Sequence, residues 1–336
     1  MNFFKKSIVQ SFVLVAILIA VLAGCADSSN QNGQDAGANS QSDYPQKTIT
    51  WIVPFSPGGN SDAIVRSAVP FLKKYLPNDV DVVVENKDGA GGTIGLTALS
   101  SADADGYTIG QTAAGPIAIQ PNYSTTSYAY DDFDTIANMA SVAQFLTVPK
   151  DAPYQTFEEW VDYVKENPGF KVGVTGAGNM QQMAMAQFAD EIGIELEFVV
   201  YKGAGPIVTA LLGGNVQSGV LAHPLVINNQ GDMNPLVNVT SVKPEELSDI
   251  PTFADKGYSS EGVFFNGVIA PKGLPDDVRD TLAQAFKEVV QDEEFKTKMD
   301  ELGQIIDYKA PEEYQELITK TYNSSGEVLE SLGLLK

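Results

Sequence analysis

The chain has 336 residues, of which 43% are hydrophobic and 19% are charged, so it is long enough for two domains with separate apolar cores. Its 21 Lys and Arg against 43 Asp and Glu give a formal net charge of −22, which leaves no positive excess to neutralise phosphates and argues against a nucleic-acid partner. A single Cys and a single His exclude an internal disulfide, a multi-His metal site and any site that needs several cysteines. We expect no metal and no cofactor.

The first 24 residues are typical of a secretory signal peptide. Lys5 and Lys6 precede an apolar run over residues 12–23, which is too short for the roughly 20 residues that span a bilayer. The run ends in Leu22-Ala23-Gly24-Cys25, which resembles the bacterial lipobox. That motif implies cleavage before Cys25 and acylation of Cys25, which would anchor an extracytoplasmic protein to a membrane surface. The alternative is a plain signal peptide followed by an unrelated thiol.

Residues 25–43 are predicted to form a flexible tether. Residues 26–43 carry no large apolar side chain and therefore cannot bury enough surface to offset the entropy of ordering. The folded body is expected to begin near Tyr44.

From there the sequence predicts strands and helices in alternation. Ile49, Trp51 and Val53 alternate as in a strand, and the strand is broken by Pro57-Gly58-Gly59. Ser61 and Asp62 are candidate caps for the helix that follows. Thr156 and Glu159 form a capping box at the start of another helix. Further strands are expected at residues 80–84, 107–109, 171–174 and 198–200, helices after the glycine-rich loops 89–92, 175–179 and 202–205, and two long helices at residues 275–290 and 311–332.

This alternation indicates α/β architecture, with mostly parallel sheets covered by helices on both faces. The predicted units fall into two groups, before and after about Val148, which indicates two domains.

Glycine-rich loops follow several of the predicted strands. In open α/β sheets, ligands bind beyond the carboxyl ends of the strands, where such loops lie. Glycine allows a close backbone approach, and the helix that follows presents unpaired N–H groups and a partial positive charge. Several such loops facing one cleft would form an anion site without Lys or Arg. For any single loop, the alternative is that glycine only permits a tight turn.

Catalytic motifs are absent from the sequence. Gly89–Ile94 and Gly176–Gln181 both lack the third glycine of the dinucleotide fingerprint G-x-G-x-x-G. His223 has no visible partner in the sequence. The acidic clusters Asp103/Asp105 and Asp131/Asp132/Asp134 could pair as acid and base, but acidic runs beside Gly and Tyr are typical of solvated turns. The spacing of Met180, Met183 and Met185 favours core positions over ligand contacts.

Five segments, taken in order, resemble the substrate-binding proteins of tripartite tricarboxylate transporters, also called Bug receptors. Trp51–Asp62 resembles the family motif V-P-F-x-P-G-G-x-x-D, and Glu85–Gly92 resembles E-N-[RK]-x-G-A-G-G. The others are Asp105-Gly106-Tyr107-Thr108, Tyr201-Lys202-Gly203 with Leu211-Leu212-Gly213-Gly214, and Ile250-Pro251-Thr252-Phe253-Ala254. The resemblance covers about residues 44–332.

The resemblance implies a type II, periplasmic-binding-protein-like clam-shell of two domains, each a mixed, mostly parallel sheet flanked by helices. Domain 1 would hold residues 44–146 and 265–336, and domain 2 residues 147–264, with chain crossings near residues 145–148 and 264–269. The implied function is that of an extracytoplasmic solute-binding lipoprotein without catalytic activity. It would capture a small organic carboxylate in the interdomain cleft and deliver it to a tripartite tricarboxylate-type permease.

The family's binding loops map onto four segments of this chain. The predicted ligand-binding residues are Phe55, Ser56, Gly58, Gly59, Asn60, Ser61, Asp62, Thr112, Ala113, Ala114, Thr175, Gly178, Asn179, Tyr201, Lys202, Gly203 and Ala204. Many family members carry an acidic or amide residue in the segment Val220–Pro224, where this chain has Leu221 and Ala222.

Backbone amides are expected to hold the ligand carboxylate, because Lys202 is the only cation inside these loops. Gly59 is expected to occupy a turn that a larger residue would strain. Asp62 is expected to order its loop by accepting backbone hydrogen bonds, or to bind ligand through water. Two other functions stay open from the residues alone. An α/β enzyme acting on a small carboxylic acid would need an acid/base pair, and a lipoprotein adhesin would need an exposed apolar patch.

Overall fold

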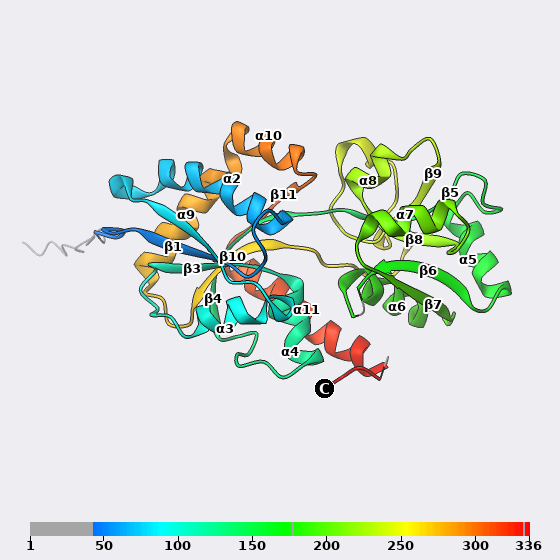
Figure 1. Ribbon diagram of the computed structural model, residues 1–336, viewed down its shortest axis with the longest axis horizontal. Coiled ribbons are helices and arrows are strands. Elements are labelled where there is room, and N and C mark those ends of the chain that lie inside the picture. Colours follow the sequence, from blue (N-terminus) through cyan, green and yellow to red (C-terminus); the bar gives the residue numbers. More distant parts are fainter. Residues whose placement is uncertain (1–42, 177, 332) are drawn as a thin grey trace, which may run out of the picture. The chain divides into compact units, whose positions relative to one another are not determined.

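Two β-sheets organise the part of the chain that the structure, a computed structural model, describes: residues 43–176, 178–331 and 333–336 (Figure 1). The predicted signal peptide, Cys25 and all but the last residue of the predicted tether lie outside these residues. The six-stranded sheet has the order β11-β4-β10-β3-β1-β2, and the five-stranded sheet has the order β7-β6-β8-β5-β9. We call the first sheet with its helices lobe 1 and the second with its helices lobe 2.

The strands of lobe 1 are β1 (Ile49–Val53), β2 (Val82–Asn86), β3 (Thr108–Ala113), β4 (Phe133–Ser141), β10 (Asn266–Pro271) and β11 (Ile305–Lys309). Those of lobe 2 are β5 (Gln144–Pro149), β6 (Phe170–Thr175), β7 (Leu196–Tyr201), β8 (Ser218–Ala222) and β9 (Met233–Asn238).

The helices of lobe 1 are α2 (Asn60–Tyr75), α3 (Thr93–Ser100), α4 (Gln120–Tyr123), α9 (Asp276–Gln291), α10 (Glu293–Glu301) and α11 (Pro311–Ser331), with a π-helix, η3 (Gly115–Ile119), directly before α4. Those of lobe 2 are α5 (Phe157–Glu166), α6 (Met180–Ile192), α7 (Ala204–Leu212) and α8 (His223–Asn228). Short 3₁₀ turns lie at η1 (Pro77–Asp79), η2 (Ala90–Gly92), η4 (Glu245–Leu247) and η5 (Ala254–Lys256). The predicted capping box is confirmed, because Thr156 and Glu159 bond each other's backbone N–H groups at the start of α5.

Both sheets are mixed. Parallel pairs join β1 to β2 and β3 in lobe 1, and β6 to β7 and β8 in lobe 2. The pairs β10–β3, β10–β4, β11–β4, β5–β8 and β5–β9 are antiparallel. The predicted α/β class with mixed sheets is therefore confirmed, but the parallel share is smaller than predicted. The difference comes from strands that no helical crossover precedes, and the sequence patterns did not reveal them.

Each sheet of lobe 1 and lobe 2 is covered by helices on both faces. In β1, Trp51 and Val53 pack with α2, α9 and α10, whereas Ile52 between them packs on the opposite face with α3 and α11. Successive side chains of a strand point to opposite faces of the sheet, so β1 contributes side chains to two hydrophobic cores. In lobe 2, one face of the sheet packs against α5 and α6 and the other against α7 and α8.

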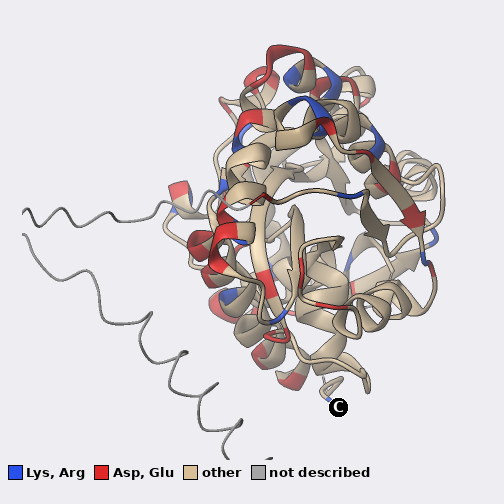
Figure 2. Cartoon of the chain, turned by 90° about the vertical axis from the view of Figure 1, so that its left-hand side faces the viewer, with Lys and Arg blue, Asp and Glu red and all other residues tan. Residues whose placement is uncertain are grey.

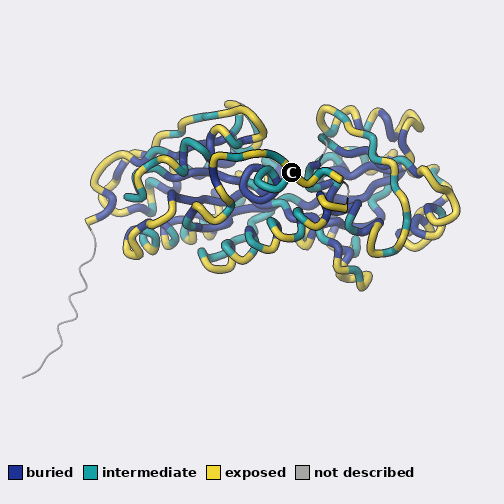
Figure 3. Tube along the Cα trace, turned by 90° about the horizontal axis from the view of Figure 1, so that it is seen from below, coloured by how far each residue is buried: buried dark blue, intermediate teal, exposed yellow. Residues whose placement is uncertain are grey.

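Burial follows this layered arrangement: in Figure 3 the strands are mostly buried and the outer sides of the helices are exposed. Asp and Glu are spread over the outer helices in the view of Figure 2, and many of these carboxylates are well exposed. No helix of the described residues is long and apolar enough to cross a membrane.

The chain passes from the sheet of lobe 1 to that of lobe 2 over residues 142–143, between β4 and β5. It returns to lobe 1 at β10, which begins at Asn266. The chain thus leaves the sheet of lobe 1 a few residues before the predicted domain boundary at 146/147, and it returns to that sheet close to the predicted boundary at 264/265. The division into domains 44–146 plus 265–336 and 147–264 stays a prediction.

Candidate ligand-binding site

A cavity of about 350 Å³ is lined by residues from both lobes and from both stretches where the chain changes sheet. Lobe 1 contributes the start of α2, the end of β3, and η3 with α4. Lobe 2 contributes the start of α6. The lining residues are Asn60, Ser61, Ala113, Ala114, Gly115, Ile119, Gln120, Val142, Gly178, Asn179, Met180, Phe264, Phe265 and Asn266.

The loop before α2 is organised around the buried carboxylate of Asp62. The Gly58 backbone N–H donates to Asp62 Oδ2 at 2.8 Å, Arg66 Nε donates to both carboxylate oxygens at 2.9 Å, and Asn86 Nδ2 donates to Oδ1 at 2.9 Å. Burial alone would raise the pKa of Asp62, but the hydrogen bonds from Arg66, Gly58 and Asn86 outweigh it and hold this pKa below its ordinary value.

Asp62 was expected to order its loop or to bind ligand through water. Its carboxylate accepts a backbone hydrogen bond from Gly58 and so orders the loop. Neither Ser61 nor Asp62 is the N-cap of α2, which corrects the expectation from the sequence. The helix begins earlier, with Gly59 as the N-cap and no side-chain cap, because Asp62 bonds the chain before the helix instead of its first turn.

The loop before α6 is held by amide side chains. Asn179 is the N-cap of α6, and its Oδ1 accepts the Gln182 backbone N–H at 3.0 Å. Gln182 Oε1 in turn accepts the Gly178 N–H at 2.8 Å. Gln181 Oε1 accepts both the N–H and the hydroxyl of Thr175, at 2.8 and 2.9 Å. This loop is thus ordered without any charged residue.

Six of the seventeen predicted ligand-binding residues line the cavity: Asn60, Ser61, Ala113, Ala114, Gly178 and Asn179. Seven lie in the same loops or in the adjoining strands and helix but do not line it, namely Phe55, Ser56, Gly58, Gly59, Asp62, Thr112 and Thr175. The remaining four lie at the end of β7, the edge strand of lobe 2, in the turn that follows and at the start of α7, and none of them lines this cavity: Tyr201, Lys202, Gly203 and Ala204. Their role as ligand contacts stays a prediction.

Other lining residues were not among the predicted ones. Val142, Phe264, Phe265 and Asn266 lie where the chain changes sheet, and the predicted second crossing at residues 264–269 was the signal that pointed to three of them. Gln120 follows a π-helix that no periodicity in the sequence indicates. Met180 lines the cavity although its spacing favoured the core, whereas Met183 and Met185 are buried as expected.

The lining is neutral. No Lys, Arg, Asp or Glu of the described residues lines this cavity, which instead combines side-chain amides, one serine hydroxyl and apolar walls. The two helices that start at the cavity, α2 and α6, are 16 and 13 residues long, and their first N–H groups have no partner inside the helix. Within the described residues, no group of three or more His, Cys, Asp or Glu could hold a metal ion.

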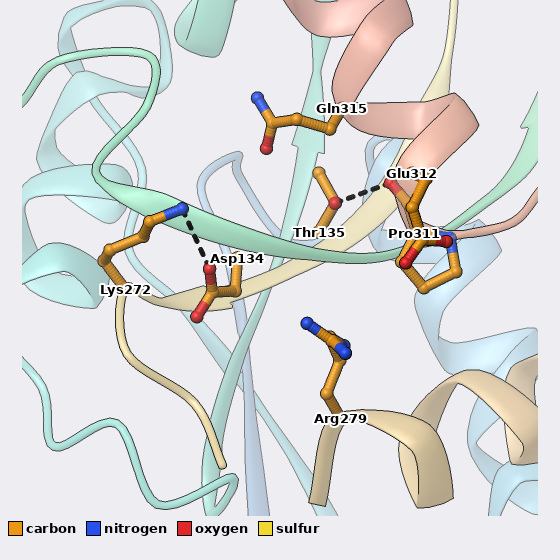
Figure 4. Close-up of a pocket in the computed structure, with 7 residues that line it drawn as sticks. All are labelled: Asp134, Thr135, Lys272, Arg279, Pro311, Glu312 and Gln315. Atoms are coloured by element: carbon orange, nitrogen blue, oxygen red, sulfur yellow. Dashed lines mark hydrogen bonds and ion pairs between the residues drawn. The ribbon is translucent and has the colours of Figure 1, made fainter. Parts of the chain in front are cut away.

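A second cavity, of about 290 Å³, lies in lobe 1 between β4, α9 and the start of α11 (Figure 4). Lys272 Nζ lies 3.0 Å from Asp134, and Arg279 lies 3.1 Å from Asp276. Glu312 also lines this cavity without an ion pair among the described residues, and Arg279 Nε is buried without a hydrogen-bond partner. The Thr135 hydroxyl donates to the Pro311 carbonyl at 2.7 Å. All residues that line this cavity belong to lobe 1. The cavity at the starts of α2 and α6 is lined by both lobes and lies beyond the carboxyl ends of parallel strands, so we assign ligand binding to that cavity.

The family model described as "Tripartite tricarboxylate transporter family receptor" matches residues 64–334. The chain belongs to this family. The resemblance found in the sequence is confirmed, and the protein is a solute-binding receptor and not an enzyme.

Individual relatives agree with the family. A Cupriavidus necator protein, named for its place in the gbd 5′ region, is 29% identical over 89% of this chain and 92% of its own length. A TctC solute-binding protein from Polaromonas, solved without ligand, is 25% identical with a TM-score of 0.81 over 86% of this chain and 99% of its own. An R. palustris protein solved with adipate is 25% identical with a TM-score of 0.68 over 87% and 99%. The two-domain α/β fold of periplasmic solute-binding proteins is thereby confirmed.

Proposed function

We propose that this receptor binds a small organic carboxylate in the cavity of about 350 Å³ at the starts of α2 and α6. The observation that carries the proposal is the neutral, amide-rich lining at the starts of α2 and α6. The R. palustris relative, solved with the dicarboxylate adipate, supports the choice of ligand class.

Backbone and side-chain N–H groups would hold the carboxylate. The N-terminus of a helix combines free N–H donors with a partial positive charge, and two such ends meet at this cavity. A chain with a net charge of −22 can still bind an anion there, because exposed carboxylates more than about 10 Å away are largely screened at physiological salt.

We propose further that the bound carboxylate is delivered to a tripartite tricarboxylate-type permease, and that an acylated Cys25 keeps the receptor at the membrane. The family match supports the first statement, and the lipobox-like Leu22-Ala23-Gly24-Cys25 supports the second. A Cys25→Ala variant expressed in the parent cell should lose acyl labelling and leave the membrane fraction. Unchanged labelling would refute the anchor.

A thermal-shift screen of the purified receptor against a panel of carboxylates tests the binding proposal. A ligand at 100 times its Kd stabilises the folded state by about 2.7 kcal/mol, which raises the melting temperature measurably. Methyl esters of the same acids serve as controls and should give no shift. If no carboxylate in the panel shifts the transition, the proposal fails.

A pair of alanine variants tests the location. Asn60→Ala removes an amide from the cavity, and Lys202→Ala removes an exposed cation outside it. We expect the first to weaken binding more than the second. The reverse result would move the site to the loop after β7.

A further inference from the structure

The side-chain amides that line the cavity share one orientation. Each of the four has its oxygen turned away to an internal donor, which leaves amide nitrogens for the ligand. The pairs are Gln304 Nε2 to Asn60 Oδ1 (3.4 Å), Ser124 Oγ to Gln120 Oε1 (3.0 Å), Gln182 N to Asn179 Oδ1 (3.0 Å) and Gln111 Nε2 to Asn266 Oδ1 (3.2 Å).

In lobe 2 this orientation is fixed by a group that can only donate. The backbone N–H of Gln182 requires an oxygen opposite it, so Asn179 must present Oδ1 to the helix and Nδ2 elsewhere. Asn179 Nδ2 donates one hydrogen to Thr175 Oγ1 at 2.9 Å and keeps its second hydrogen.

In lobe 1 the orientation is fixed by groups that can only accept. Gln304 Nε2 lies 3.5 Å from the carbonyl oxygens of both Leu302 and Gly303, so its amide oxygen must face the other way, toward Asn266 Nδ2 at 3.3 Å. Asn266 therefore turns its own oxygen toward Gln111. Gln304, Asn266 and Gln111 are all at most 6% exposed, so water does not compete strongly for these bonds.

A ligand in this cavity consequently meets hydrogen-bond donors. Within the described residues, the amide nitrogens of Asn60 and Gln120 donate to no protein group, and those of Asn179 and Asn266 each use one of two hydrogens. No carboxylate side chain of the described residues lines the cavity. Each lining amide oxygen already accepts from an internal donor, so within the described residues the Ser61 hydroxyl is the lining side chain whose oxygen accepts no hydrogen bond.

We propose that the cavity selects carboxylates that lack an ammonium group, an inference that rests on the proposed carboxylate-binding function. An ammonium group brings three donors and a positive charge, and it would face N–H groups and the positive ends of α2 and α6 without a carboxylate to pair with. An ammonium group that leaves water and gains no hydrogen-bond acceptors in the cavity would lose binding free energy. Additional carboxylate, keto or ether oxygens, in contrast, find donors. Gln304 and Gln111 act as positioning residues, because they orient the lining amides without lining the cavity.

Matched ligand pairs test the selection by titration calorimetry: adipate against L-2-aminoadipate, malate against L-aspartate, and every other carboxylate that shifts the melting temperature against its α-amino analogue. We expect each amino compound to bind at least about tenfold more weakly than its partner. An amino compound that binds within threefold of its partner, or more tightly, overturns this inference and leaves the proposed function intact. If no carboxylate binds at all, the proposed function and this inference fall together.

A charge variant provides a second readout that loss of folding cannot imitate. Asn60→Asp places an acceptor and a negative charge in the cavity, so the ratio of the two Kd values in a pair should shift toward the amino compound by about tenfold or more. Asn215→Asp, an exposed residue after α7 outside the cavity, makes the same charge change and should leave the ratio within about twofold. Equal ratios in both variants would show that Asn60 does not face the ligand, which would overturn the inference.

Discussion

One glycine in the loop before α2 has a backbone conformation that other residues avoid. Gly58 has φ of +77°, and its N–H donates to the buried Asp62 carboxylate, whereas Gly59 has an ordinary φ of −76°. The positive φ thus lies at Gly58, whereas the crowding expected at Gly59 comes from the Ser56 carbonyl oxygen, which a Cβ at Gly59 would approach to 3.2 Å. Gly58→Ala should lower the free energy of unfolding by about 1–2 kcal/mol, measured by urea denaturation, because a side chain is disfavoured at positive φ.

Gly231→Ala is the matched control for that prediction, since Gly231 has no positive φ and open space where a Cβ would lie. It should change stability little or raise it slightly. Equal losses in the two variants would contradict the argument from φ.

At the scale of residues, the sequence predicted the cavity residues at or beyond the carboxyl ends of parallel strands, such as Asn60, Ala113 and Asn179. It missed Gln120 and Asn266. A π-helix places Gln120 in the cavity, and the return of the chain to lobe 1 at β10 places Asn266 there. Neither feature has a local sequence pattern. The orientation of the amides also depends on Gln304, which lies far away in the sequence.

At the scale of elements, prediction depended on whether a strand had a recognisable pattern. β1 alternates and a helix follows it, so its bounds at Ile49–Val53 were predicted. β10 is buried at every position and begins with Asn-Gly, and β4 mixes Asp, Asn and Ser into a nearly fully buried strand. A strand enclosed between neighbours and helices loses the alternation that sequence reading requires. These strands supply the antiparallel pairs of lobe 1 and, in β10, part of the cavity.

One carboxylate joins three helices. Asp292, the N-cap of α10 directly after α9, accepts from Lys74 Nζ at 2.8 Å and from the Tyr75 hydroxyl at 2.7 Å, both at the end of α2. The hydrogen bond from Lys74, with that from Tyr75, lowers the pKa of Asp292 to about 2. A lowered pKa contributes stability that is fully present above the ordinary aspartate pKa of about 3.9 and is lost as the pH falls toward 2.

Asp292→Asn should therefore be less stable than the wild type at pH 7 and 5, and the difference should shrink as the pH falls from 4 to 2. Urea denaturation at each pH measures it. Asp103→Asn is the matched control and should change stability little, because Asp103 is exposed and its carboxylate makes no hydrogen bond or ion pair among the described residues. A difference between Asp292→Asn and wild type that is constant over this range would contradict the linkage.

At the scale of the whole described body, the same short stretches connect the lobes and line the cavity. Val142 lies in the two-residue link between β4 and β5, and Phe264 and Phe265 directly precede β10. A small cluster that includes Met183 of α6 and Leu329 of α11 adds an apolar contact between lobe 2 and lobe 1. Rotation about the two connections would change the width of the cavity while leaving each sheet intact.

Binding should therefore close the lobes, because a ligand that contacts both α2 and α6 favours the arrangement in which both contacts are made. Small-angle scattering with the carboxylate that gives the largest thermal shift should show a smaller radius of gyration than without it. The methyl ester of that acid is the control and should leave the radius unchanged. After long incubation the acid should be recovered intact, as a receptor requires. An unchanged radius at saturating ligand would mean that the carboxylate binds to one lobe alone, without the hinge motion that the two connections permit.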